Sequence, residues 1–184
     1  MSFVNALAVL ILGILTRNSP STEATQNRAE RLASQIWDVV TQSPELPFDG
    51  DGAREATAAM LLAIAHHESG LREDIEDCSR CDGRDATCDR GKSIGMYQLH
   101  QGAAWFGHPR ASICADNELA TALALKVLLA NRRGGHALAI FNGYASGNMA
   151  NRGAAAARIS RLFGMHSRKL GVMTTGRVAT TRPL

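Results

Sequence analysis

Apolar residues recur along this chain at the spacing of helices rather than of strands. The repeat predicts an amphipathic helix over residues 24–41, which Ser21 or Thr22 would cap at its first turn. A second helix is expected over residues 53–69, because Gly70 after it supplies a typical helix stop. Both segments carry their large apolar residues three and four positions apart, so each should bury one face against a core.

The second half of the chain is expected to add three more helices. Their ranges are 117–131, 136–141 and 154–163. Between the two halves, residues 77–95 are polar and rich in turn-forming residues, which predicts a long irregular loop. We therefore expect a mainly α fold, a compact helical domain interrupted by one long cysteine-rich loop.

The first residues form a separate segment, 1–17. Residues 3–15 are apolar apart from Asn5 and Gly13, which is too short to span a bilayer comfortably but matches a signal-peptide core. No Lys or Arg precedes them, and no small-residue cleavage site follows. Three interpretations stay open: an export signal, a membrane anchor or contact through residues 3–15, and a first helix buried against the domain.

Length, composition and charge narrow the choice of fold class and of binding partner. A chain of 184 residues predicts one main domain, here 18–166, and its alanine-rich apolar content with few aromatic residues favours packed helices. From Arg152 to the end the chain has seven Lys or Arg residues and no Asp or Glu, so residues 167–184 are expected to form a basic tail that suits a polyanion. Basic runs interleaved with aromatic residues are absent, so we expect no nucleic-acid partner.

The chain has four cysteines, Cys78, Cys81, Cys88 and Cys114. Three pairings are conceivable, and the sequence does not choose among them. Cys78-x-x-Cys81 begins like a zinc site, yet the other two cysteines stand alone and far apart, which disfavours one. Disulfides are the expected state if the chain is exported, and we expect no metal or cofactor.

Glu68 is the candidate catalytic group. It continues the apolar stripe of Leu61, Ile64 and Ala65 and lies in the last turn of its helix. Burial and the helix C-terminus both raise a carboxyl pKa, and a Glu that stays protonated near neutral pH can act as a general acid. The competing interpretation is an exposed carboxylate at a helix end, paired with His66 or a nearby Arg.

Two later segments carry polar groups in apolar surroundings. In residues 93–98, Gly95 permits close approach of a ligand to the backbone, while Tyr97 and Gln98 could stack on and hydrogen-bond to a sugar. Further on, a helical pattern runs into Asn142 and a glycine. A core tyrosine, a buried glutamine and an ordinary helix stop explain the same residues equally well.

Taken in order, these segments resemble the soluble lytic transglycosylase and goose-type lysozyme superfamily. Residues 68–71 match its Glu-Ser motif, residues 93–98 match Ser-x-Gly-x-x-Gln, and residues 139–142 match an alanine-rich helix ending in an aromatic residue and Asn. The opening of the helix at residues 117–119 is also similar. The resemblance extends over residues 53–147.

The resemblance implies a lysozyme-like α+β fold dominated by helices, and the β-1,4 bond between N-acetylmuramic acid and N-acetylglucosamine in peptidoglycan as substrate. Glu68 would protonate the glycosidic oxygen. In a lytic transglycosylase the same group then assists attack by the muramyl 6-hydroxyl. Gln98 and Asn142 would position the sugars, and Ser69 and Ser93 would support them.

The chain departs from the family pattern in three places, one of which is the order Gly143-Tyr144 after Asn142 instead of Ala-Gly. Phe141 stands where the family has Tyr, so Tyr97 or Tyr144 would have to supply a hydroxyl near the catalytic carboxyl. The cysteine-rich loop carries several aspartates, among which Asp85 and Asp89 are candidates for a second carboxylate. Such a group would hold a water and make the enzyme an inverting hydrolase.

The expected function is therefore that of a peptidoglycan-degrading enzyme, most simply a lytic transglycosylase, which is a lyase. Alternatives are an inverting lysozyme-type hydrolase and a non-catalytic glycan-binding or structural virion component of the same fold. A zinc peptidase is disfavoured because His66-His67-Glu68 lacks the His-Glu-x-x-His spacing. The substrate would place the protein in the cell envelope or periplasm, or outside the cell, as a bacterial enzyme or a phage lysin.

Overall fold

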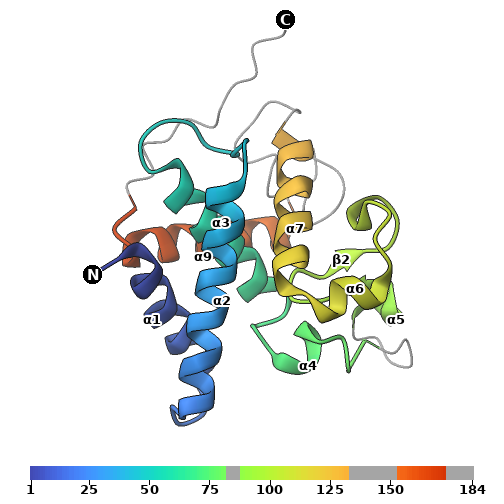
Figure 1. Ribbon diagram of the computed structural model, residues 1–184, viewed down its shortest axis with the longest axis horizontal. Coiled ribbons are helices and arrows are strands. Elements are labelled where there is room, and N and C mark those ends of the chain that lie inside the picture. Colours follow the sequence, from blue (N-terminus) through green and yellow to red (C-terminus); the bar gives the residue numbers. More distant parts are fainter. Residues whose placement is uncertain (82–87, 133–152, 173–184) are drawn as a thin grey trace, which may run out of the picture.

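A computed structural model describes residues 1–81, 88–132 and 153–172, and within these ranges the chain is mainly helical with two short strands (Figure 1). The elements in chain order are α1 (Phe3–Leu15), α2 (Glu23–Gln42), α3 (Ala53–Glu68), α4 (Glu73–Glu76), α5 (Cys88–Gly91), β1 (Ser93–Ile94), β2 (Leu99–His100), the 3-10 turn η1 (Ala103–Trp105), α6 (Arg110–Ala115), α7 (Asn117–Arg132) and α9 (Ala154–Lys169). The predicted mainly α class is confirmed.

The apolar N-terminal segment forms α1, which packs along α2. Leu7 and Ile11 are fully buried between the two helices, and the ring of Phe3 lies 4.8 Å from that of Trp37. In this structure the segment packs on the domain through Leu7, Ala8 and Ile11, while Val9 on its outer side is exposed. In the described part of the chain, no helix combines the length and the apolar character needed to cross a membrane.

Helix α2 agrees closely with its prediction. The hydroxyl of Thr22 accepts the backbone N–H of Thr25, and the Thr25 hydroxyl reciprocally accepts the N–H of Thr22. The apolar face expected from the sequence is buried through Leu32, Ile36 and Val40. Local sequence therefore determines both where this helix begins and which face it buries.

Helix α3 is the centre of the molecule. The sequence predicts one apolar stripe, but every residue from Ala56 to Ala65 is buried. Helices α1, α2, α7 and α9 all contact α3, and Figure 1 shows α9 crossing behind it. The small side chains of its many alanines let neighbours approach on several sides, so the helix needs no polar face.

The last described helix, α9, is longer than predicted. It continues past Phe163 to Lys169, and His166 and Ser167 within the extension are buried. The boundary predicted between the domain and its basic tail, at residue 167, therefore lies inside α9. The sequence did not indicate this because the residues concerned are polar, yet the helix that carries them packs against α3. The helix expected over 136–141 lies outside the described residues.

The cysteine-rich region is folded around two disulfides. Cys78 bonds to Cys114 and Cys81 bonds to Cys88, with Cα atoms 5.5 and 5.3 Å apart. The disulfide prediction is confirmed, and it leaves none of the four thiols for zinc. Within the predicted loop of residues 77–95, the described part contains the left-handed turn α5 and the strand β1, in which Ile94 opposes Leu99 of β2.

Candidate functional site

Glu68 is the last residue of α3, and its side chain is half-buried. Burial raises the pKa of its carboxyl group from 4.5 to about 7. Among the residues that the structure describes, none makes a hydrogen bond or ion pair with this carboxyl group. The pairing with His66 that the competing interpretation proposed does not form, since that ring bonds to His166 instead. The Glu68 carboxyl group thus keeps its proton to a higher pH than an exposed carboxyl group does.

Ser69 shapes the end of α3. Its hydroxyl donates to the carbonyl of Ala65 at 2.9 Å and accepts the backbone N–H of Leu71 at 3.1 Å. The side chain is buried, so in this conformation Ser69 holds the end of the helix and is not open to a ligand. Beyond it, Gly70 and Leu71 both adopt left-handed backbone angles, with φ of 63° and 57°.

Sequence reasoning missed a buried polar group next to this turn. Arg28 on α2 forms an ion pair with Glu76 on α4, and Asn117 at the start of α7 donates to the other carboxylate oxygen. Arg28 also donates to the carbonyl of Leu71 at 2.9 Å. These partners are separated by 41 to 48 residues along the chain, so no local pattern could reveal them. We call Arg28, Glu76 and Asn117 the clamp.

The Ser-x-Gly-x-x-Gln motif forms the strand β1 and the turn that leads into β2. Ser93 is half-buried in β1, and Gly95 is buried with φ of 69°, a conformation that favours glycine. Gln98 is half-buried with φ of 48°, and its amide donates to the carbonyl of Gly95 at 3.1 Å. Its nitrogen also lies 3.6 Å from the sulfur of Cys88. Gln98 therefore braces the hairpin turn.

Tyr97 does not occupy a sugar-binding position. Its side chain is fully buried, and its hydroxyl accepts a hydrogen bond from Thr121 on α7 at 3.2 Å. Burial raises the pKa of this phenol. Stacking on a sugar would require the core to open, so the prediction of a substrate contact is wrong for this conformation. The alternative of a core tyrosine describes it.

The remaining predicted site residues divide into two groups. Asp85, Asn142 and Tyr144, together with the unusual Phe141, lie outside the described residues. Asp89 is described and exposed, and its carboxylate lies 3.4 Å from the Nε2 atom of His100. As the second-carboxylate candidate within the described region, Asp89 is therefore solvated and partnered rather than buried.

A histidine cluster adjoins Glu68 on α3. The Nδ1 atom of His66 lies 3.2 Å from Nε2 of His166 on α9, and the rings stack at 5.4 Å. Burial lowers the pKa of His66, of its neighbour His67 and, to about 4, of His166. These imidazoles are therefore neutral at pH 7. Their positions were not recognised from the sequence, because 100 residues separate the paired rings.

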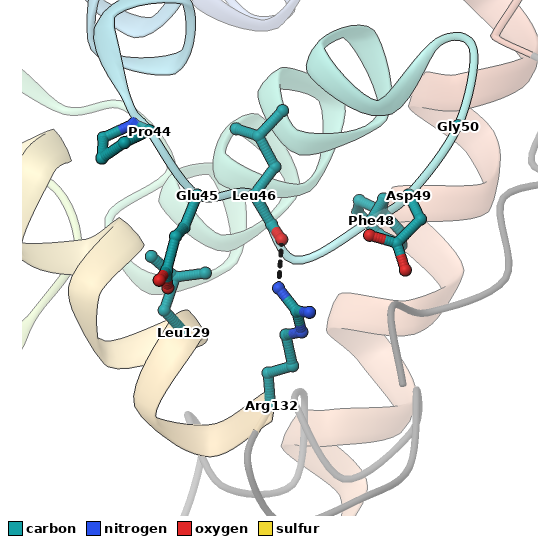
Figure 2. Close-up of a pocket in the computed structure, with 8 residues that line it drawn as sticks. All are labelled: Pro44, Glu45, Leu46, Phe48, Asp49, Gly50, Leu129 and Arg132. Atoms are coloured by element: carbon teal, nitrogen blue, oxygen red, sulfur yellow. Dashed lines mark hydrogen bonds between the residues drawn. The ribbon is translucent and has the colours of Figure 1, made fainter. Parts of the chain in front are cut away.

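Three cavities lie elsewhere on the molecule. One of about 460 Å³ opens between the loop that joins α2 to α3 and the end of α7, where Figure 2 shows Arg132 reaching up to the carbonyl of Leu46. Two others, of about 520 and 440 Å³, lie along α2 beside α7 and beside α1. Glu68 lines none of these three. Over the described ranges, no group of three His, Cys, Asp or Glu side chains is placed to hold a metal.

Comparisons with protein-family models, with curated proteins and with solved structures found no match to this chain.

Proposed function

We propose that this protein is a peptidoglycan-cleaving enzyme in which Glu68 is the general acid and base. The observation that supports the proposal most is the half-buried carboxyl group at the end of α3, whose pKa is raised to about 7. A glycosidic oxygen is a poor leaving group until it receives a proton, and an ordinary carboxyl group has lost its proton at neutral pH. A buried Glu that retains one is the type of acid this reaction requires.

The proposed reaction uses Glu68 twice. Protonated Glu68 gives its proton to the oxygen that links N-acetylmuramic acid to N-acetylglucosamine, and the bond from that oxygen to the muramyl C1 breaks. The Glu68 carboxylate then takes the proton of the muramyl 6-hydroxyl while the oxygen of that hydroxyl attacks C1. The products are a 1,6-anhydromuramyl end and a free N-acetylglucosamine hydroxyl, and Glu68 regains its starting proton.

A hydrolase remains the alternative chemistry. It needs a second carboxylate to activate water on the opposite side of the sugar ring. Asp89 is exposed and paired with His100, which makes it a weak candidate for that role. Mass spectrometry of the released fragments separates the two outcomes, because a transglycosylase leaves anhydro ends and a hydrolase leaves reducing ends.

The second candidate function is a non-catalytic glycan-binding or structural module. It is favoured by the burial of Tyr97 and by the absence of Glu68 from the three cavities described above. Such a module would co-sediment with purified walls and release no soluble fragments from them.

The proposed site of action is the cell envelope or the exterior of the cell. The two disulfides are compatible with an oxidising compartment, and peptidoglycan is found there. A basic C-terminal region would suit the anionic polymers of a cell wall.

The direct test is wall lysis by Glu68→Gln, which keeps the shape of the side chain but cannot give up or take a proton. We expect at least a hundred-fold loss in the rate at which the turbidity of purified walls falls. Glu73→Gln is the matched control, because it makes the same change at an exposed carboxyl on α4. Lysis by the Glu68 variant at the wild-type rate would end the proposal.

A further inference from the structure

The chain turns sharply directly after Glu68. Gly70 and Leu71 both have left-handed φ values, 63° and 57°, and a leucine seldom adopts that conformation. The Leu71 side chain is also fully buried, so the turn cannot relax outward without losing core contacts. A strained backbone of this kind persists only where the surroundings hold it.

The clamp supplies that hold. Arg28 donates to the carbonyl of Leu71 at 2.9 Å, and the same nitrogen pairs with the carboxylate of Glu76. Asn117 donates to the second oxygen of that carboxylate. Helices α2, α4 and α7 are thus joined to the backbone three residues beyond Glu68.

A contribution to folding stability does not by itself explain why the clamp is buried. The side chains of Arg28 and Glu76 are only 11% and 8% exposed, and a buried ion pair often adds little net stability because both charges lose their hydration. The Nε atom of Arg28 is buried without a hydrogen-bond partner among the described residues, which adds a further cost. What the clamp does provide is a fixed geometry: Arg28 holds the Leu71 carbonyl of the turn, Glu76 holds Arg28, and Asn117 holds the second oxygen of Glu76.

We propose that the clamp is a positioning device that fixes the end of α3 and thereby holds the carboxyl group of Glu68 in its working place. This inference rests on the proposed function, in which Glu68 is the acid. Arg28, Glu76 and Asn117 act through Leu71 and do not touch the substrate. Misplacing a catalytic group by about 1 Å can cost about a hundred-fold in rate, so a small movement of the turn is enough to matter.

The test compares variants that loosen the clamp with one that leaves it intact. Glu76→Gln removes its charge, and Asn117→Ala removes one hydrogen bond without changing any charge. Asp74→Asn is the matched control, because it removes a carboxylate from the same helix whose ion pairs with Arg72 and Arg80 are exposed. Two quantities are measured: the kcat and KM of wall cleavage, and the titration of the Glu68 carboxyl carbon by NMR, assigned with Glu68→Gln.

We expect both clamp variants to lower kcat at least ten-fold while KM stays within two-fold. The pKa of Glu68 should also move from about 7 toward its ordinary value as water reaches the carboxyl group. Asp74→Asn should match wild type in both readouts. Because Asn117→Ala alters no charge, a shift in that variant reports position rather than a lost neighbouring charge. If Glu76→Gln fails to fold, Asn117→Ala carries the test.

A folded Asn117→Ala protein in which Glu68 titrates as in wild type would overturn the clamp proposal. Wild-type lysis by Glu68→Gln would instead overturn the proposed function. The NMR titration needs no substrate, so it decides the clamp in either case.

Discussion

Two groups of buried polar side chains adjoin the end of α3, and they are built in opposite ways. The clamp joins a cation, an anion and an amide, and its carboxylate is bonded through both oxygens. The histidine pair of His66 and His166 joins two neutral rings, and the Nδ1 atom of His166 is buried with no partner in the described part of the chain. The clamp depends on the charges of its members, whereas the histidine pair depends on both rings staying neutral.

The surroundings of the two groups reinforce this difference. The charges that act on the histidine cluster are those of Arg17, Arg158 and Lys169, and all three lower the histidine pKa values. In the clamp, each charge has its opposite within bonding distance. We therefore expect the clamp to fail when one partner is removed and the histidine pair to fail when acid charges it.

The largest effect is expected from breaking the clamp on one side. Arg28→Met should lower the free energy of unfolding by about 3–5 kcal/mol, because it leaves Glu76 buried without its cation. Urea denaturation at pH 7 measures the loss. The double variant Arg28→Met with Glu76→Leu should recover most of it, because no buried charge is left.

Arg72→Met tests whether burial of the ion pair is the reason for the large loss of stability in Arg28→Met. Its ion pair with Asp74 is exposed, so the loss should stay below about 1 kcal/mol. Equal losses from Arg28→Met and Arg72→Met would contradict the contrast between buried and exposed pairs.

The next largest effect is expected from removing the two disulfides of the cysteine-rich region. Cys78–Cys114 links residues 36 apart and Cys81–Cys88 links residues 7 apart. Loop entropy predicts that replacing the first pair by Ser costs about 4 kcal/mol and the second about 2 kcal/mol. Thermal unfolding of the two double variants measures the difference, and the reverse order would show that loop entropy is not the main contribution.

Acid should break the histidine pair. A histidine has an unfolded pKa of 6.5 and His166 has a folded pKa of about 4, so the folded state binds fewer protons between these values. Its contribution to stability is complete above pH 6.5 and is lost as the pH falls through about 4, by about 3 kcal/mol. Urea midpoints from pH 7 to 4 should fall less steeply for His166→Gln, and an exposed control, His100→Gln, should follow wild type.

Glu68 should show a smaller effect of opposite sign. Its folded pKa of about 7 exceeds the ordinary 4.5, so burial of the carboxyl group favours folding only in acid and opposes it increasingly from pH 4.5 to 7. Glu68→Gln should therefore gain about 2 kcal/mol of stability at pH 8 and nothing at pH 4, less than the value for His166 because solvent partly screens this half-buried carboxyl group. A variant less stable than wild type at pH 8 would show that the carboxylate has a stabilising partner.

Much of the helical framework could be predicted from the sequence. The limits of α2, α3 and α7 follow from caps and apolar spacing, and Gly70 does adopt the left-handed conformation expected after a helix end. The environment of Glu68 was also predictable, because a residue one turn beyond a buried stripe is carried toward the same core.

Other features could not be read from the sequence. Tyr97 fits a sugar platform and a core residue equally well, and only its place under α7 decides for the core. The end of α9 was missed because His166 and Ser167 are polar by type, yet α3 buries them. Burial of a polar side chain depends on what lies opposite, and its own neighbours in sequence do not report that.

By itself, the sequence determined the helices, the candidate acid Glu68 and the expectation of disulfides, because caps, periodicity and residue chemistry act over a few residues. Tertiary structure decided which cysteines pair and which polar side chains are buried against one another. The clamp and the histidine pair join residues 41 to 100 positions apart, and such contacts arise only when packing brings distant helices together.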